Sequence, residues 1–297
     1  PTSAGVPAGT KRSLALIGLR RRSAGSNRHG GTKRPGQSEA SRAAEWRSVD
    51  RLKAQAERPV RQRLRDLFDR QGEAVAQNLR TLAQEQPGAL GLAMRARKSP
   101  LIVEKIFDLL RWQQETTDAI APALRQAIEE GIQSGALRVG FEATDLTTDD
   151  PQVLAELQRL LRQTKNVQET LSDRLAEDIQ GAISEGGDLE DVVQTVRGRF
   201  DDMKGWKSRQ IAQTATTGAF ESGQLQSFRE ARIEAKEWLS MRDDRVRADH
   251  RNADATIVAL EDPFEVGGAS LMYPGDPSAP PGQVVNCRCT IQPARKD

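Results

Sequence analysis

The chain has 297 residues and a formal net charge of +2; 37% of the residues are hydrophobic and only 4% are aromatic. This composition favours helices rich in Ala, Leu and Gln over a β core filled with aromatic side chains. No apolar run approaches the ~20 residues that a membrane-spanning helix needs, and two cysteines are too few for a disulfide framework, so we expect synthesis in a reducing compartment. The sequence begins at Pro1 rather than Met, as expected of a fragment, a processed product or the tail of a longer polypeptide.

The positive charge is concentrated at the beginning of the sequence. Residues 1–50 carry ten Lys or Arg against three acids, whereas the remainder carries 34 basic and 39 acidic residues. We expect residues 1–42, which are rich in Gly and Ser, to form a disordered basic arm or linker. Two interpretations stay open, a DNA-binding arm and a solvated linker, because no aromatic residue precedes Trp46 to stack on bases. A DNA-binding arm would use Lys11, Arg12, Arg20, Arg21, Arg22, Lys33 and Arg34.

A helical region is predicted over residues 43–148. Apolar residues recur at three- and four-residue steps up to about Glu85, where the sequence Gln-Pro-Gly-Ala-Leu follows. We expect a second helix to begin with Ser99 as its N-cap and to bend or restart at Pro122, because a proline interrupts the hydrogen-bond ladder. A further helical stretch is expected to end at the Ser-Gly-Ala-Leu sequence of residues 134–137.

A second helical block is predicted to begin at the Asp-Asp-Pro sequence that ends with Pro151. Leucines, isoleucines and valines from 157 to 183 form one stripe on a helix of about thirty residues. Two glycines end this helix and Asp188 caps a shorter one, after which another helix is expected from about Trp206 to Ala235.

From about residue 236 the composition changes to short β-like runs separated by Gly and Pro. These runs are Glu-Trp-Leu-Ser-Met, Thr-Ile-Val-Ala-Leu and Gln-Val-Val-Asn-Cys-Arg-Cys-Thr-Ile-Gln. The sequence therefore predicts a mainly α fold, with an elongated helical body and a small C-terminal α+β unit.

The two cysteines, Cys287 and Cys289, are one residue apart on the last predicted strand and should face the same side. If the short helix that carries His250 continues, Asp254 shares its face one turn later. One His and two Cys, with an Asp or a water as the fourth ligand, form a plausible zinc site. Two alternatives stay open: buried cysteines that only fill the core, and a Cys–His catalytic pair for which no orienting third group is identified.

Five segments of the second half stand in an order and spacing that together resemble one family. They are ISEGGDLEDVVQTVRGRF, RQIAQTATTGAFESGQLQSF, KEWLSMRDDRVRADHRNAD, PFEVGGASLMYPGDP and NCRC. This order resembles the phage head morphogenesis domain, the family of Mu-F-like minor head proteins of tailed phages. The resemblance covers about residues 150–297, and we assign residues 149–297 to this domain. The chain departs from the family at residues 211–215, which read Ile-Ala-Gln-Thr-Ala where the family commonly reads Ile-Ala-Arg-Thr-Glu. The Arg and Glu of the family pattern are absent here, so any role of that pair is not assigned to this chain.

The resemblance implies a non-enzymatic minor head (capsid) protein of a tailed phage or prophage, made in the bacterial host cytoplasm. It implies a place in the virion at the portal vertex, with action in procapsid assembly and in DNA packaging or ejection. The expected partners are the portal protein, capsid and scaffold proteins and double-stranded DNA, without a membrane. Two other functions stay open: a metal-dependent enzyme or effector that uses His250, Cys287 and Cys289, and a DNA-binding module.

Overall fold

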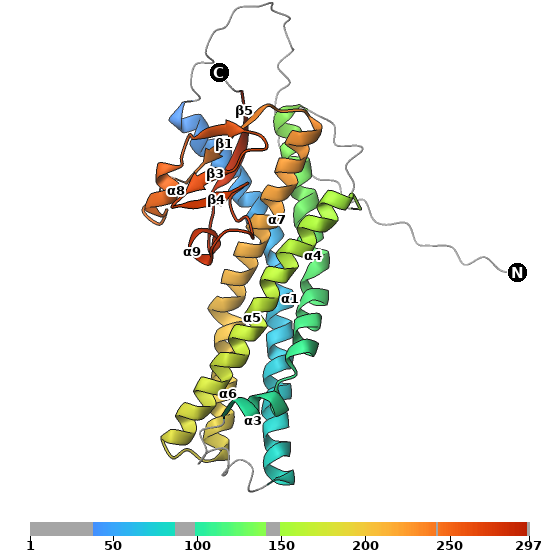
Figure 1. Cartoon of the computed structure of the whole chain (residues 1–297), viewed down its shortest axis with the longest axis vertical. Helices are drawn as coiled ribbons and strands as arrows, with labels where there is room; N and C mark the ends of the chain where they lie inside the picture. Colours follow the sequence, from blue (N-terminus) through green and yellow to red (C-terminus); the bar gives the residue numbers. More distant parts are fainter. Residues whose placement is uncertain (1–37, 87–98, 141–148, 242, 296–297) are drawn as a thin grey trace, which may run out of the picture. The chain divides into compact units, whose positions relative to one another are not determined.

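A computed structural model describes residues 38–86, 99–140, 149–241 and 243–295 (Figure 1). The larger helices are α1 (Glu39–Glu85), α3 (Ser99–Ile106), α4 (Leu109–Val139), α5 (Pro151–Ser184), α6 (Leu189–Asp202) and α7 (Ser208–Glu230). The C-terminal elements are β1 (Ala235–Leu239), α8 (Ala248–Asn252), β2 (Ile257–Ala259), β3 (Phe264–Val266), β4 (Ala269–Leu271), α9 (Pro281–Val284) and β5 (Thr290–Ala294). The fold is mainly α with a small C-terminal α+β unit, as the sequence predicted.

The first helix begins earlier than apolar spacing predicted. Its N-cap is Ser38, whose hydroxyl accepts a hydrogen bond from the backbone N–H of Ser41 at 3.2 Å. Residues 39–42, which we had placed in the basic arm, therefore belong to α1. The cap lies outside the apolar repeat, so apolar periodicity alone places the start of the helix too late in the sequence.

The helix predicted from Ser99 to beyond Pro122 is two helices, because Asp108 caps a new start. The Asp108 carboxylate accepts a hydrogen bond from the backbone N–H of Arg111 at 3.0 Å. The helix α4 then continues through Pro122 and through residues 134–137, where we had expected breaks. It ends instead at Gly140, whose left-handed backbone (φ 71°) terminates the helix.

The long stripe predicted on α5 is confirmed. The helix begins at Pro151 with Asp150 as its N-cap, and its buried residues include Leu157, Leu160, Leu161, Leu171, Leu175, Ile179 and Ile183. The following helix, α6, begins with a capping box in which Asp188 and Asp191 each accept a hydrogen bond from the other's backbone N–H.

The helix α7 is buried on nearly all sides along its second half, and α1, α4 and α5 pack against it. It ends at Glu230, five residues before the predicted Ala235, which belongs to β1. Small residues allow α4 and α7 to meet at their backbones. A Cβ atom added to Gly223 of α7 would lie 2.1 Å from the carbonyl oxygen of Ile128 in α4.

Substituting Gly223 with Ala should therefore lower the free energy of unfolding by about 1–3 kcal/mol, because two backbones must separate to admit one methyl group. Urea unfolding monitored by circular dichroism measures the change. The matched control is Gly181→Ala in α5, where an added Cβ meets nothing within 4 Å and should be neutral or mildly stabilising. Equal stabilities of the two variants would contradict the close contact between α4 and α7.

The C-terminal unit combines a three-stranded antiparallel sheet, in the order β2-β1-β5, with the hairpin β3-β4. The first two strands match two of the predicted β-like runs. Its core consists of Trp238, Phe264, Leu271, Tyr273, Val284, Ile291 and neighbouring apolar residues, joined by Leu225 and Phe228 of α7. No helix in the described part of the chain is long and apolar enough to cross a membrane.

One strand residue in this core is a buried lysine. Lys236 is fully buried in β1, and its Nζ has no hydrogen-bond partner within the described residues. Burial, reinforced by the charge of Arg229, lowers the pKa of Lys236 to about 8, whereas an unfolded lysine titrates near 10.4. Because the folded chain binds fewer protons between these values, its free energy of unfolding rises as the pH rises from about 8 to about 10.

Replacing Lys236 with Met should raise the free energy of unfolding at about pH 7 by on the order of 2 kcal/mol, because the buried charge is removed. The gain should shrink between about pH 8 and 10, where folded wild-type protein loses the same charge. Urea unfolding over this pH range measures both effects, with Lys165→Met on the partly exposed side of α5 as the control. A gain that is absent, or that stays constant with pH, would contradict this account.

Candidate metal centre

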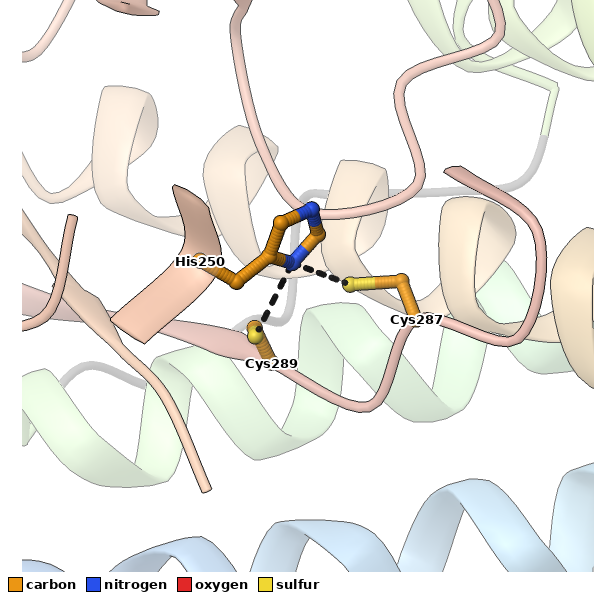
Figure 2. A group of neighbouring side chains, drawn as sticks. All are labelled: His250, Cys287 and Cys289. Atoms are coloured by element: carbon orange, nitrogen blue, oxygen red, sulfur yellow. Dashed lines mark hydrogen bonds between the residues drawn. The ribbon is translucent and has the colours of Figure 1, made fainter. Parts of the chain in front are cut away.

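His250, Cys287 and Cys289 meet in the C-terminal unit, as the sequence predicted (Figure 2). The Nδ1 atom of His250 lies 3.5 Å from the Cys287 Sγ atom and 3.4 Å from the Cys289 Sγ atom. All three donor atoms lie within 4.8 Å of one another, and the exposed fractions of the three residues are 2%, 2% and 3%. The arrangement is therefore a compact, buried set of one nitrogen and two sulfur donors.

The His250 ring is held by neighbours that leave Nδ1 facing the sulfurs. Its Nε2 atom lies 3.1 Å from the Gln283 Oε1 atom, and the Gln283 amide donates in turn to Asp249 Oδ2 at 3.1 Å. Because this second bond orients the amide, Gln283 presents an acceptor, which favours a proton on Nε2 and a lone pair on Nδ1. Trp238 packs edge-on against the ring at 5.4 Å. Such outer partners are typical of metal-binding histidines.

The two cysteines lie in a loop before β5, not on the strand that the sequence predicted. The turn at Asn286 has a left-handed backbone (φ 57°), a conformation that Asn tolerates better than most residues. The loop backbone is fixed from α7, where the Thr217 hydroxyl donates to the Cys287 carbonyl at 3.1 Å. The cysteines nevertheless share one side, because the loop turns both sulfurs toward His250.

The geometry fits a tetrahedral zinc ion. With Zn–N near 2.0–2.1 Å and Zn–S near 2.3 Å, a nitrogen and a sulfur ligand of one zinc lie roughly 3.5 Å apart. The two N–S distances match this value. The pKa of the Cys287 thiol is well below its usual value because Cys289 donates a hydrogen bond to it. The same hydrogen bond and burial raise the pKa of Cys289.

The three candidate ligands line a small cavity. This cavity has a volume of about 20 Å³, room for about one water molecule, and its walls include Arg245, Arg247, Asn286 and Arg288. The Arg247 guanidinium donates a hydrogen bond to the Val285 carbonyl. The Arg288 guanidinium donates to the Asp243 carboxylate at 2.6 Å. A water or a small anion is therefore the fourth ligand that this space admits.

Asp254 does not join this centre, in contrast to the prediction. The helix α8 ends at Asn252, so Asp254 lies beyond the helix and does not share a helical face with His250. The Asp254 carboxylate instead accepts hydrogen bonds from the Ser240 backbone N–H at 2.8 Å and from Arg42 at 3.1 Å. It therefore connects the C-terminal unit to α1.

The residues predicted to contact DNA lie outside the described part of the chain. They are Lys11, Arg12, Arg20, Arg21, Arg22, Lys33 and Arg34.

A buried ion pair beside the metal centre was not predicted. Glu221 of α7 is fully buried and accepts hydrogen bonds from Lys53 at 3.0 Å, from the Thr290 hydroxyl at 3.0 Å and from the Ile291 backbone N–H at 2.9 Å. Burial raises the pKa of Glu221, and the charge of Lys53 opposes this shift. The Lys53 ammonium group also donates to the Cys289 carbonyl at 2.7 Å. One pair thus joins α1, α7 and the cysteine loop.

The sequence does carry a signal for half of this pair. Lys53 stands in the buried stripe of α1 that includes Val49, Ala56 and Val60, at positions spaced by three and four residues. A lysine in such a stripe needs a buried partner. Only the packing of α1 against α7 identifies that partner as Glu221.

Comparison with known families bears on the part of the chain that holds the metal centre. Residues 173–292 match the family described as Phage Mu protein F like protein. This segment is therefore similar to the Mu-F-like family. The match includes all three candidate zinc ligands and confirms the resemblance on sequence motifs, although it begins within α5 rather than near residue 150.

One curated relative extends the similarity beyond the Mu-F-like segment. The chain is 24% identical over 187 residues to the uncharacterized protein YqbB of Bacillus subtilis (strain 168). The alignment covers 61% of this chain and 57% of YqbB, so the chain spans little more than half of that relative. No solved structure matches the chain significantly.

Proposed function

We propose that this chain is a minor head protein of a tailed phage or prophage that acts at the portal vertex during procapsid assembly. The Mu-F-like segment over residues 173–292 carries the proposal. Its expected partners are the portal protein and the capsid or scaffold proteins, and the virion is its expected location. The long helices α1, α4 and α5 provide exposed faces for such contacts, while their buried stripes hold the fold.

Purified particles of the phage or prophage that encodes the chain provide the test. The chain should be present in heads and procapsids, and it should remain with portal oligomers when particles are dissociated. Deleting its gene should reduce the yield of DNA-filled heads. Absence of the chain from both heads and procapsids would overturn the proposal.

Contact with double-stranded DNA is a separate proposal that rests on the basic arm. The truncation that tests it should remove residues 1–37 only, because Ser38 caps α1 and Arg42 forms ion pairs with Glu237 and Asp254. The truncated chain should lose a strongly salt-dependent DNA affinity. Equal affinity at every salt concentration would identify residues 1–37 as a linker.

We also propose that His250, Cys287 and Cys289 hold a zinc ion with a structural role. The N–S distances of 3.5 and 3.4 Å carry this proposal. Burial of all three ligands and a cavity for about one water favour a structural ion over the metal-dependent enzyme that the sequence left open. A hydrolytic centre needs space for a substrate beside the metal-bound water.

A further inference from the structure

Trp206 is an exposed aromatic residue in an unusual backbone segment. Of the four tryptophans, Trp46, Trp112 and Trp238 are at most 5% exposed, whereas Trp206 is 56% exposed. It lies in the segment Met203–Lys207, a kink between α6 and α7, where the backbone of Gly205 leaves the helical region (ψ −109°).

An apolar groove lies on one side of Trp206, between α5 and α7. It has a volume of about 430 Å³, and its walls include Val167, Leu171, Met203 and Ile211. Pro281 and Val285 of the C-terminal unit also contribute to its lining. The groove is therefore large enough to receive several apolar side chains of a partner, and two helices form its long walls.

Positive charge lines this groove at Lys207. The Lys207 ammonium lies 4.2 Å from the Trp206 ring centroid and donates a hydrogen bond to the neutral amide of Gln210. The two nearby arginines have acidic partners: Arg174 pairs with Glu177 and Arg199 with Asp178. Burial and the charges of these arginines lower the pKa of Lys207. Asp202 also lines the groove, where it is one acid against Lys207, Arg174 and Arg199.

A second hollow lies on the other side of Trp206 and is also basic. It has a volume of about 560 Å³, and its lining includes Arg61, Arg65 and Arg209. None of these three forms a salt bridge within the described residues, whereas Lys204 in the same hollow bridges Asp69 and Asp201. Trp206 thus stands between an apolar groove and a surface with excess positive charge.

We propose that this face docks an amphipathic helix of a partner protein, with apolar residues along one side and Asp or Glu along the adjacent edges. The apolar side would enter the groove beside Trp206, and the acidic edges would face Lys207 and the three arginines. Exposed tryptophan and arginine are the residue types that most often dominate such interfaces. The inference adds a docking face to the proposed head function and does not depend on it.

The observations favour this partner over two others. This surface offers a nucleic acid a single aromatic ring for base stacking, and the aliphatic walls of the groove do not stack on bases. The chain's own apolar run, Leu14 to Leu19, is followed by Arg20, Arg21 and Arg22, which would bring positive charge to a positive surface.

The test uses the full chain and three labelled model peptides of about 18 residues, or five helical turns. One peptide places Leu on one face and Glu on the other, the second replaces Glu with Lys, and the third keeps the acidic composition with the Leu positions scrambled. Fluorescence anisotropy measures binding. Iodide quenching of tryptophan fluorescence reports on Trp206, because the other three tryptophans are buried.

The acidic amphipathic peptide should bind with a Kd on the order of 10 μM and protect Trp206 from iodide, and the other two peptides should not. Trp206→Ala and Lys207→Glu should each weaken binding about tenfold or more. The matched control is Leu137→Ala, which removes an exposed apolar side chain from α4 and should leave binding unchanged.

Three results would overturn the proposal. The first is an acidic peptide that fails to bind or binds both groove variants as tightly as the wild type. The second is protection of Trp206 by a single-stranded DNA oligomer but not by the peptide, which would indicate a nucleic-acid surface. The third is self-association of the chain that Trp206→Ala abolishes, which would indicate a second copy as the occupant.

Discussion

Replacing Cys289 with Ser should release about one zinc ion per chain and lower the free energy of unfolding by roughly 3–5 kcal/mol. The serine hydroxyl stays protonated near neutral pH, so it cannot replace the thiolate, and the loop before β5 loses its connection to α8. This loss of unfolding free energy should be smaller than the free energy with which zinc binding stabilises a zinc finger. The reason is that the C-terminal unit has its own core around Trp238 and Phe264. Metal analysis and urea unfolding measure the two effects.

The alternative interpretation, in which the cysteines only fill the core, gives a different result. A buried Cys→Ser change would then cost about 1–2 kcal/mol, and a chelator would leave the wild-type stability unchanged. The double variant separates the two cases. If zinc is bound, Cys287→Ser should add little to Cys289→Ser, because the first change already removes the ion. Additive losses in a metal-free, fully folded protein would exclude the zinc site.

The sequence predicted which three residues meet at this centre better than it predicted the elements that carry them. His250 and the two cysteines could be grouped because few residue types bind zinc and the chain has few of them. Asp254 was included only because a helix was assumed to continue past Asn252, where it ends. The left-handed turn at Asn286 likewise precedes a strand that begins only at Thr290, later than the sequence predicted. Such single-residue backbone changes leave no periodic pattern in the sequence.

Helices were predicted well where a single apolar face repeats over many turns. The stripe on α5 identified that helix almost to its ends, because its caps, Asp150 and the glycine pair after Ser184, are local signals. The helix α7 shows the limit. It is buried on most sides by small residues such as Gly218 and Gly223, so its contacts with α4 and the C-terminal unit depend on tertiary packing.

The first helix connects the helical region to the metal centre through several polar contacts. Arg42 forms ion pairs with Glu237 and Asp254, the Trp46 indole donates to the Arg288 carbonyl at 3.0 Å, and Lys53 donates to the Cys289 carbonyl. Two of the acceptors belong to the cysteine loop. The position of α1 and the geometry of the proposed zinc ligands should therefore depend on each other.

The buried pair of Lys53 and Glu221 makes this dependence measurable. Glu221→Ala should lower the free energy of unfolding by about 3–5 kcal/mol, because it leaves the Lys53 ammonium buried without its countercharge. Adding Lys53→Met should recover part of the loss, since the double variant buries no unpaired charge. A double-mutant cycle from urea unfolding gives the coupling between the two side chains.

An exposed pair provides the matched control. Arg80 and Glu190 lie 2.9 Å apart near the surface, so Glu190→Ala should change the free energy of unfolding little. A loss at Glu221 no larger than this, or a double variant no more stable than Glu221→Ala, would contradict the assigned pair.

The same variants test the connection between α1 and the metal. Lys53→Met alone removes the hydrogen bond to the Cys289 carbonyl, an outer contact of a proposed zinc ligand, and should weaken zinc affinity by about 10- to 100-fold. Competition with a chromogenic chelator measures this affinity, and Glu190→Ala should leave it unchanged. If Lys53→Met destabilises the fold but retains full zinc affinity, the ion pair supports the packing of α1 on α7 alone. A joint loss would show that the first helix helps to fix the metal centre of the Mu-F-like segment.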